Sequence, residues 1–209
     1  MSRFPVVRQR PPVVHIIDDE PNLRASLLNL FDSMDISAKA FESAEAFLAD
    51  VDGGTSGCVL LDIQMPGMSG LELQRELMRL GNPIPIIFMT GNASVSMSIS
   101  AMKAGAFDFL LKPFNSAAVT AATAAAIERD EDNRKRARER SELQACKEQL
   151  TPREAEVLGY VSKGLMNKQI AFEMSISEVM VKLHRGRMMR KMQAKTIVEV
   201  VRKYDLLLV

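Results

Sequence analysis

The 209-residue chain has no tryptophan and only two cysteines, two tyrosines and two histidines. Cys58 and Cys146 lie far apart and neither has the spacing of a metal ligand, so we expect neither a zinc site nor a disulfide framework. Two distant thiols fit a reducing cytoplasm, where we expect the protein to be located. No apolar segment follows the arginines near the N-terminus, and no apolar run approaches the roughly 18 residues that span a bilayer. We therefore expect no signal peptide and no membrane partner.

An excess of one charge is also lacking overall, since the net charge is only +1. The two ends of the chain nevertheless differ. Residues 1–126 contain 13 acidic and 9 basic side chains, whereas residues 150–209 contain 6 acidic and 11 basic ones. A chain of this length suits one large or two small domains. The charges indicate a metal or phosphate site in the first half and a nucleic-acid partner for the second.

Short apolar runs alternate with amphipathic stretches through the first half. They occupy residues 13–17, 36–41, 58–61, 84–89 and 107–111. Short strands separated by helices of about 10–15 residues are typical of repeated βαβ units. We therefore predict an α/β fold with a five-stranded parallel, doubly wound sheet that is covered by helices on both faces.

Residues 94–100 alternate polar and apolar side chains, which on pattern alone is typical of a strand. We predict a helix instead, because the crossover between two parallel strands needs a connection of helix length. Its serines give this segment a low helix propensity, so it is expected to be the least stable helix of the domain.

Polar side chains follow four of the apolar runs, and the carboxyl ends of parallel strands meet in one crevice. These side chains are Asp18, Asp19, Asp62, Thr90 and Lys112. Three converging carboxylates favour a hard divalent cation such as Mg²⁺. A hydroxyl and an ammonium beside them suit a transferred phosphoryl group, for which an ionised carboxylate is a ready nucleophile.

Five motifs stand in this half: HIIDDE at 15–20, LDIQMPG at 61–67, MTG at 89–91, AMKAGAFDF at 101–109 and KPF at 112–114. Together they resemble, over residues 12–125, the receiver domain of two-component response regulators in its FixJ-like branch. The resemblance implies a flavodoxin-like fold and a cognate histidine kinase as the partner. His15 lies inside the first apolar run, where we expect a core histidine with its hydrogen bonds satisfied.

The resemblance also implies roles for individual residues. Asp62 would accept the phosphoryl group. Asp19 and Asp62 would bind Mg²⁺ directly, Asp18 would bind it through water, and the backbone carbonyl of Gln64 would add a ligand. Lys112 would contact the phosphoryl group, next to a cis bond to Pro113. Thr90 and Phe109 would form the switch, the first turning toward the phosphate and the second turning inward.

Residues 127–149 interleave charges of both signs, which predicts a charged helical linker between the two domains. A solvated connector and a dimerising helix both remain open, although the apolar positions Ala137, Leu143 and Leu150 are too sparse for a coiled coil. The expected boundaries are an N-terminal extension at 1–11, the receiver at 12–126, this linker, and a DNA-binding domain at 150–209.

Residues 150–209 predict four short helices. Thr151, Pro152 and Glu154 form a helix start with a capping box, Gly164 ends that helix, and Ser177 caps a later basic helix. A short helix at 167–174, a tight turn and a basic helix form a helix-turn-helix, whose second element enters the major groove of DNA.

This half resembles the LuxR-type helix-turn-helix family, on LTPRE at 150–154, NKQIA at 167–171 and VKLHR at 181–185. The resemblance implies binding to promoter DNA as a homodimer that forms on phosphorylation. The residues expected to bind DNA are Lys182, Leu183, Gly186, His184, Arg185, Arg187, Asn167 and Lys168. Two positions depart from the family pattern: Met180 replaces a threonine, and Ser175 replaces a glycine at the turn.

We therefore predict a phosphorylation-dependent transcription regulator and not an enzyme with turnover. One alternative is a phosphorylation-independent DNA-binding protein with a vestigial receiver. Another is a Mg²⁺-dependent phosphatase or phosphotransferase working through an aspartyl phosphate, which would have no need of a basic DNA-binding domain.

Overall fold

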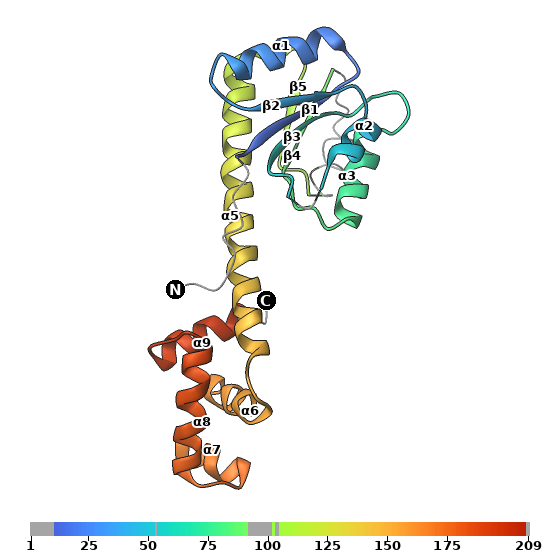
Figure 1. Cartoon of the computed structure of the whole chain (residues 1–209). Coiled ribbons are helices and arrows are strands. Elements are labelled where there is room, and N and C mark those ends of the chain that lie inside the picture. The colour runs from blue at the N-terminus through green and yellow to red at the C-terminus, as the bar shows by residue number, and fades with distance from the viewer. Residues whose placement is uncertain (1–10, 53, 92–101, 103–104, 208–209) are drawn as a thin grey trace. The chain divides into compact units, whose positions relative to one another are not determined.

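The computed structural model describes residues 11–52, 54–91, 102 and 105–207, and Figure 1 shows the chain. The chain divides into two compact units, with the boundary between Asn133 and Arg134. The first unit contains a sheet with helices, and the second is helical. The first unit has two buried cores and the second unit has one.

The first unit contains a parallel five-stranded sheet, as the apolar runs predict. The strands are β1 (Val13–Ile17), β2 (Ala38–Phe41), β3 (Gly57–Asp62), β4 (Ile86–Thr90) and β5 (Asp108–Leu111). Their order is β2-β1-β3-β4-β5, so the chain changes direction across the sheet between β1 and β3. In such sheets the crevice beyond this point, at the carboxyl ends of the strands, is where ligands bind.

Helices cover both faces of this sheet (Figure 1). They are α1 (Pro21–Asp32), α2 (Ala44–Asp50), α3 (Gly70–Arg79) and the first part of α5 (Ser116–Glu148). Phe47 and Leu73 from α2 and α3 pack in one core, whereas Phe31 and Val119 from α1 and α5 pack in the other. Successive strand residues alternate between the two cores, as the pleat requires. The helix predicted at residues 94–100 lies outside the described residues.

His15 is buried in β1 between two phenylalanines, at ring-centroid distances of 6.1 Å from Phe41 and 5.4 Å from Phe47. Neither ring nitrogen has a hydrogen-bond partner at ordinary distance in the described part of the chain. The expected core position is therefore confirmed, but the expectation of satisfied hydrogen bonds is wrong. Burial lowers the pKa of His15, and the Ser56 backbone and nearby acids oppose this only in part.

We expect His15 to make the first unit sensitive to acid. Below pH of about 6.5 the unfolded chain takes up a proton on this imidazole that the folded chain resists, so the free energy of unfolding falls as the pH falls from there toward the lowered pKa. His15→Leu removes this loss. Hydrogen exchange of the β1 amides gives the free energy of unfolding of both proteins from about pH 7.5 to about 5.5. This free energy should fall more steeply with falling pH in wild type than in His15→Leu. Parallel curves for the two proteins would contradict the expectation.

The second unit contains the four predicted helices: α6 (Pro152–Ser162), α7 (Asn167–Met174), α8 (Glu178–Lys191) and α9 (Ile197–Asp205). The predicted capping box is confirmed, since the Thr151 side chain accepts from the Glu154 amide and Glu154 accepts from the Thr151 amide. The Ser177 side chain likewise accepts from the Met180 amide at the start of α8. The buried Glu154 carboxylate also forms an ion pair of 2.6 Å with Lys191, whose side chain is half-buried.

Helix α5 is continuous from Ser116 to Glu148 and contains the whole predicted linker up to that residue. Asp130 is buried in the first unit, where its side chain accepts a hydrogen bond of 2.9 Å from the Gly57 amide. Leu143 and Cys146 are buried in the second unit. Residues 135–142 between these positions are exposed. Within the described residues, no helix combines the length and apolar content needed to cross a bilayer.

Candidate functional sites

At the carboxyl edge of the sheet, the Lys112 ammonium bonds to two carboxylates that follow or end other strands. Lys112 follows β5, and its Nζ lies 2.7 Å from Oδ2 of Asp18, which follows β1, and 2.7 Å from Oδ2 of Asp62, which ends β3. A longer contact of 3.5 Å reaches Glu20. Residues that are up to 94 positions apart in sequence therefore meet at one point.

Burial makes this cluster electrostatically strong. Asp18 is fully buried and Asp62 is 6% exposed. Burial raises the pKa of Asp18, although the Lys112 ammonium opposes the rise. Burial also opposes the charge on Lys112, but its hydrogen bonds to Asp18 and Asp62 outweigh this and raise the pKa of Lys112. The site thus holds a fixed positive charge against two carboxylates, in a region where water screens little.

The acidic side chains also suit a hard cation. One carboxylate oxygen from each of Asp18, Glu20 and Asp62 lies within 4.8 Å of the others. Asp19, predicted as a direct ligand, is exposed and is not part of this group. Glu20 was missed by the sequence reasoning, although its position directly after the acidic pair could have indicated it. Oxygen donors at this spacing are what Mg²⁺ prefers.

Backbone geometry brings the chain close around Asp62. The Gln64 amide donates to Asp62 Oδ1 at 3.1 Å. A side chain at Gly70 would place its Cβ 2.3 Å from the Asp62 carbonyl oxygen, so only glycine lets α3 begin there. The Lys112–Pro113 bond is cis, as predicted.

The two predicted switch residues lie on the neighbouring strands. Thr90 is the last residue of β4 and is buried, with its register partner Leu111 on β5. Phe109 lies on β5, is half-buried, and packs against the core between the sheet and helices α2 and α3. Thr90 therefore lies at the same edge of the sheet as Asp62, and Phe109 is one strand further.

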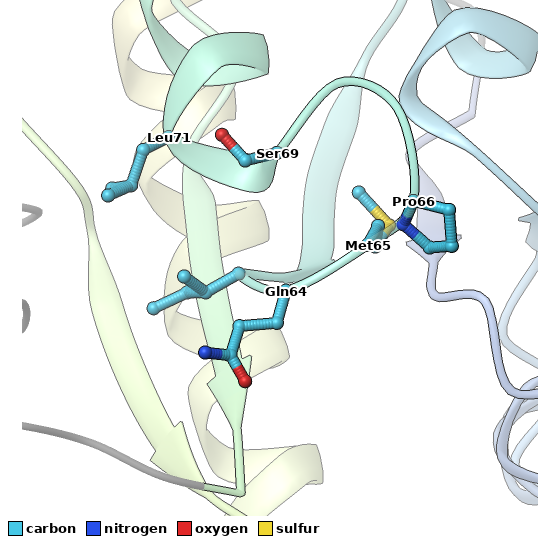
Figure 2. Close-up of a pocket in the computed structure, with 6 residues that line it drawn as sticks. Gln64, Met65, Pro66, Ser69 and Leu71 are labelled. Carbon is cyan, nitrogen blue, oxygen red and sulfur yellow. The ribbon is translucent and has the colours of Figure 1, made fainter.

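A pocket of about 540 Å³ lies beside the loop that follows Asp62. Figure 2 shows its labelled side chains strung along this loop into the start of α3. The pocket is lined by Ile63, Gln64, Met65, Pro66, Ser69 and Leu71. Ser69 donates to Glu72 and caps α3, so its hydroxyl is engaged in holding the helix. The lining is mainly apolar and contains none of the charged residues of the site.

The helix-turn-helix of the second unit consists of α7, the turn at Ser175 and α8. Val181 and Met188 face the core, and Lys182, Leu183, Gly186, Arg187 and Lys168 are exposed. His184 is half-buried, and its Nδ1 has no hydrogen-bond partner in the described chain. Asn167 and Arg185 are also half-buried and form a hydrogen bond to each other of 2.6 Å. The eight predicted DNA-contact residues therefore divide into five that are exposed and three that are half-buried, and two of these three bond to each other.

The turn residue Ser175 has φ 53° and ψ 43°, the left-handed conformation that favours glycine. A side chain costs about 1 kcal/mol in this region. Ser175→Gly is therefore expected to raise the melting temperature of the second unit by about 4 °C. Calorimetry of the full chain can measure this shift, with Ala155→Gly inside α6 as a control that should lower it. A lower melting temperature for Ser175→Gly would contradict the expectation.

Comparison with known families covers both units. Residues 14–124 match the family described as response regulator receiver domain, and residues 148–204 match the family described as bacterial regulatory proteins, luxR family. The chain is 42% identical to nodulation protein W of Bradyrhizobium diazoefficiens, over 93% of this chain and 86% of that protein. It is 43% identical to the response regulator protein TodT of Pseudomonas putida, over 92% and 85% of the two chains.

Solved structures agree with this assignment. The response regulator StyR superposes with a TM-score of 0.83 at 37% identity, over 94% of this chain and 99% of that one. Full-length FixJ from B. japonicum gives a TM-score of 0.58 at 37% identity, over 94% and 97%. The chain belongs to the response regulators, with a receiver domain and a LuxR-type helix-turn-helix domain. It is a two-component transcription regulator of the kind that phosphorylation controls.

Proposed function

We propose that Asp62 is the phosphorylated residue and that a histidine kinase is the phosphoryl donor. The observation that carries the proposal is the pair of 2.7 Å contacts that Lys112 makes with Asp62 and Asp18. Oδ2 of Asp62 lies beside a fixed positive charge, and so would a phosphoryl group bound to it. That charge offsets the negative charge that the phosphoryl oxygens bring.

In the proposed step an Asp62 carboxylate oxygen attacks phosphorus, and the bond from phosphorus to the kinase imidazole nitrogen breaks. The product is an acyl phosphate on Asp62, and water later releases phosphate from it. Lys112 leaves its contact with Asp62 for the new phosphoryl oxygens while Asp18 continues to hold it. The protein thus assists only its own phosphorylation and dephosphorylation.

Mg²⁺ would neutralise charge and orient the phosphoryl oxygens at this site. The residues proposed to hold it are Asp18, Asp19, Asp62 and the backbone carbonyl of Gln64. Glu20 is a further carboxylate within reach, because its oxygen lies in the same group as those of Asp18 and Asp62.

The response to the acyl phosphate is proposed to run through Thr90 and Phe109. Thr90 ends the strand beside β3, so its hydroxyl can donate to a phosphoryl oxygen on Asp62. Phe109 then turns further inward from its half-buried position on β5. The surface of the first unit at β5 also carries an exposed apolar side chain, because Leu111 at the end of this strand is 59% exposed. This surface is proposed to form the homodimer.

The DNA-binding domain, proposed to occupy residues 150–209 of the second unit, would then bind promoter DNA in each protomer of the homodimer. Lys182, Leu183 and Gly186 are exposed on α8 and are proposed to face the major groove. Lys168 and Arg187 are proposed to contact phosphates, and His184 to lie at the rim of the groove. A receiver at 12–126 and a linker at 127–149 complete the proposed organisation.

The decisive experiment compares the full chain with Mg²⁺ alone and with Mg²⁺ plus beryllium fluoride, which mimics the phosphoryl group. Sedimentation measures the dimer fraction, and binding is measured on duplexes recovered by selection from a randomised library. We expect both dimer fraction and DNA affinity to rise with beryllium fluoride. Unchanged affinity would instead support a DNA-binding protein with a vestigial receiver.

A further inference from the structure

Arg185 lies on a different side of α8 from the exposed basic residues. It stands four positions after Val181 and three before Met188, and both of these are fully buried. Residues at these spacings share one face of a helix. Arg185 is half-buried accordingly, whereas Lys182 and Arg187 are exposed. Its guanidinium is therefore held at the junction of α7 and α8 and not on the outer surface of α8.

The partner of this guanidinium is a neutral amide. Arg185 Nη1 donates to Oδ1 of Asn167, the first residue of α7, at 2.6 Å. In the described part of the chain no carboxylate lies within ion-pair distance of Arg185. Another cation held between helices of this unit, Lys191, pairs with the carboxylate of Glu154 at 2.6 Å instead. The two cations thus differ in whether their charge is neutralised.

A neutral partner has a specific consequence. The amide fixes the direction of the guanidinium but leaves its full positive charge, and four of its five N–H donors remain for other acceptors. A partly buried cation with no counter-charge is costly, and an external anion relieves that cost. A nucleic-acid phosphate is such an anion, and Arg recognises it with two parallel hydrogen bonds.

We infer that Asn167 is a positioning residue, which holds the Arg185 guanidinium unneutralised so that it can receive a DNA phosphate. The inference rests on the DNA-binding function proposed above and changes the role of Asn167 within it. Asn167 acts through Arg185. Arg185 contacts the phosphate backbone of the DNA and reads no base. The contact strengthens binding to all sequences alike, because phosphates carry no sequence information.

The test uses Asn167→Asp and Arg185→Ala in the full chain, with Mg²⁺ and beryllium fluoride, on the duplex selected with wild type. Asn167→Asp keeps the acceptor but supplies a carboxylate that neutralises Arg185. We expect each variant to lose about 10-fold in affinity. We also expect the slope of log affinity against log salt to shrink by about 0.9 for each protomer. The melting temperature of Asn167→Asp should stay level or rise, because its pair with Arg185 is stronger.

Gln169→Glu is the matched control, since it adds the same charge to the same turn of α7. Gln169 accepts from the Met166 amide, a role that Glu keeps, and it has no bond to Arg185. In the double variant with Arg185→Ala, we expect Gln169→Glu to add its full small loss of DNA affinity. Combined with Arg185→Ala, Asn167→Asp should add no larger loss of affinity than Gln169→Glu does. A wild-type salt slope in Asn167→Asp, or full additivity with Arg185→Ala, would overturn the inference. Failure of wild type to select any duplex would overturn the proposed function and this inference with it.

Discussion

Asp62→Asn is expected to abolish labelling by acetyl phosphate and every response to beryllium fluoride. Wild type should gain between about 5-fold and about 150-fold in DNA affinity on activation, the usual range for coupling between two sites. Asp62→Asn should show no gain, because an amide neither attacks phosphorus nor binds the mimic. The amide keeps the shape of the carboxylate and can still accept from the Gln64 amide, so the fold should persist.

The matched control for this variant is Asp50→Asn, which removes a carboxylate from α2. Asp50 forms an ion pair of 3.0 Å with Lys39 on the surface. This pair includes none of the charged residues around Asp62. Labelling and the DNA response should be as in wild type. Retained labelling in Asp62→Asn would show that another residue accepts the phosphoryl group.

Lys112→Met is expected to cost the first unit about 3–5 kcal/mol in the absence of divalent ions. The variant leaves the fully buried Asp18 facing Asp62 without the ammonium that now lies 2.7 Å from each. Hydrogen exchange of the β1 and β3 amides measures the loss in this unit alone. Lys39→Met, which breaks an exposed ion pair, is the control and should cost at most about 1 kcal/mol.

Mg²⁺ should reverse much of the loss in Lys112→Met, because the carboxylates then regain a cation. At a concentration about 100 times the dissociation constant, an ion that binds only the folded state stabilises it by about 2.7 kcal/mol. The variant should therefore depend on Mg²⁺ for stability more than wild type does. Equal effects of Mg²⁺ on Lys112→Met and Lys39→Met would show that the ion does not bind beside Asp18.

The convergence of the charged site could be predicted because topology alone produces it. Once the apolar runs indicate a parallel sheet, the residues that follow them must meet at the carboxyl edge, whatever the details of packing. Asp18, Asp62 and Lys112 follow from this rule. The capping box at Thr151 and the cap at Ser177 were equally predictable, since they depend only on residues within four positions of each other.

Contacts that depend on side-chain direction could not be predicted in the same way. Asp19 and Glu20 are adjacent acids, and only the turn after β1 decides which of them lies with Asp62. Arg185 belongs to a basic helix, so charge alone placed it with the exposed residues, whereas its half-buried position depends on how α7 packs against α8. The lack of partners for His15 likewise depends on Phe41 and Phe47, which come from other elements.

The hydrogen bond between Asp130 and the Gly57 amide bears on how the chain can be divided into fragments. A receiver fragment that stops at residue 126 would leave this amide at the start of β3 without its acceptor, and it would also lack Ile127, which packs against the core on the α1 and α5 side of the sheet. A fragment that begins at residue 150 would likewise omit Leu143 and Cys146, which lie buried in the other unit. Expression boundaries should therefore be drawn between Asp130 and Leu143, so that each fragment retains the turns of α5 that complete its core.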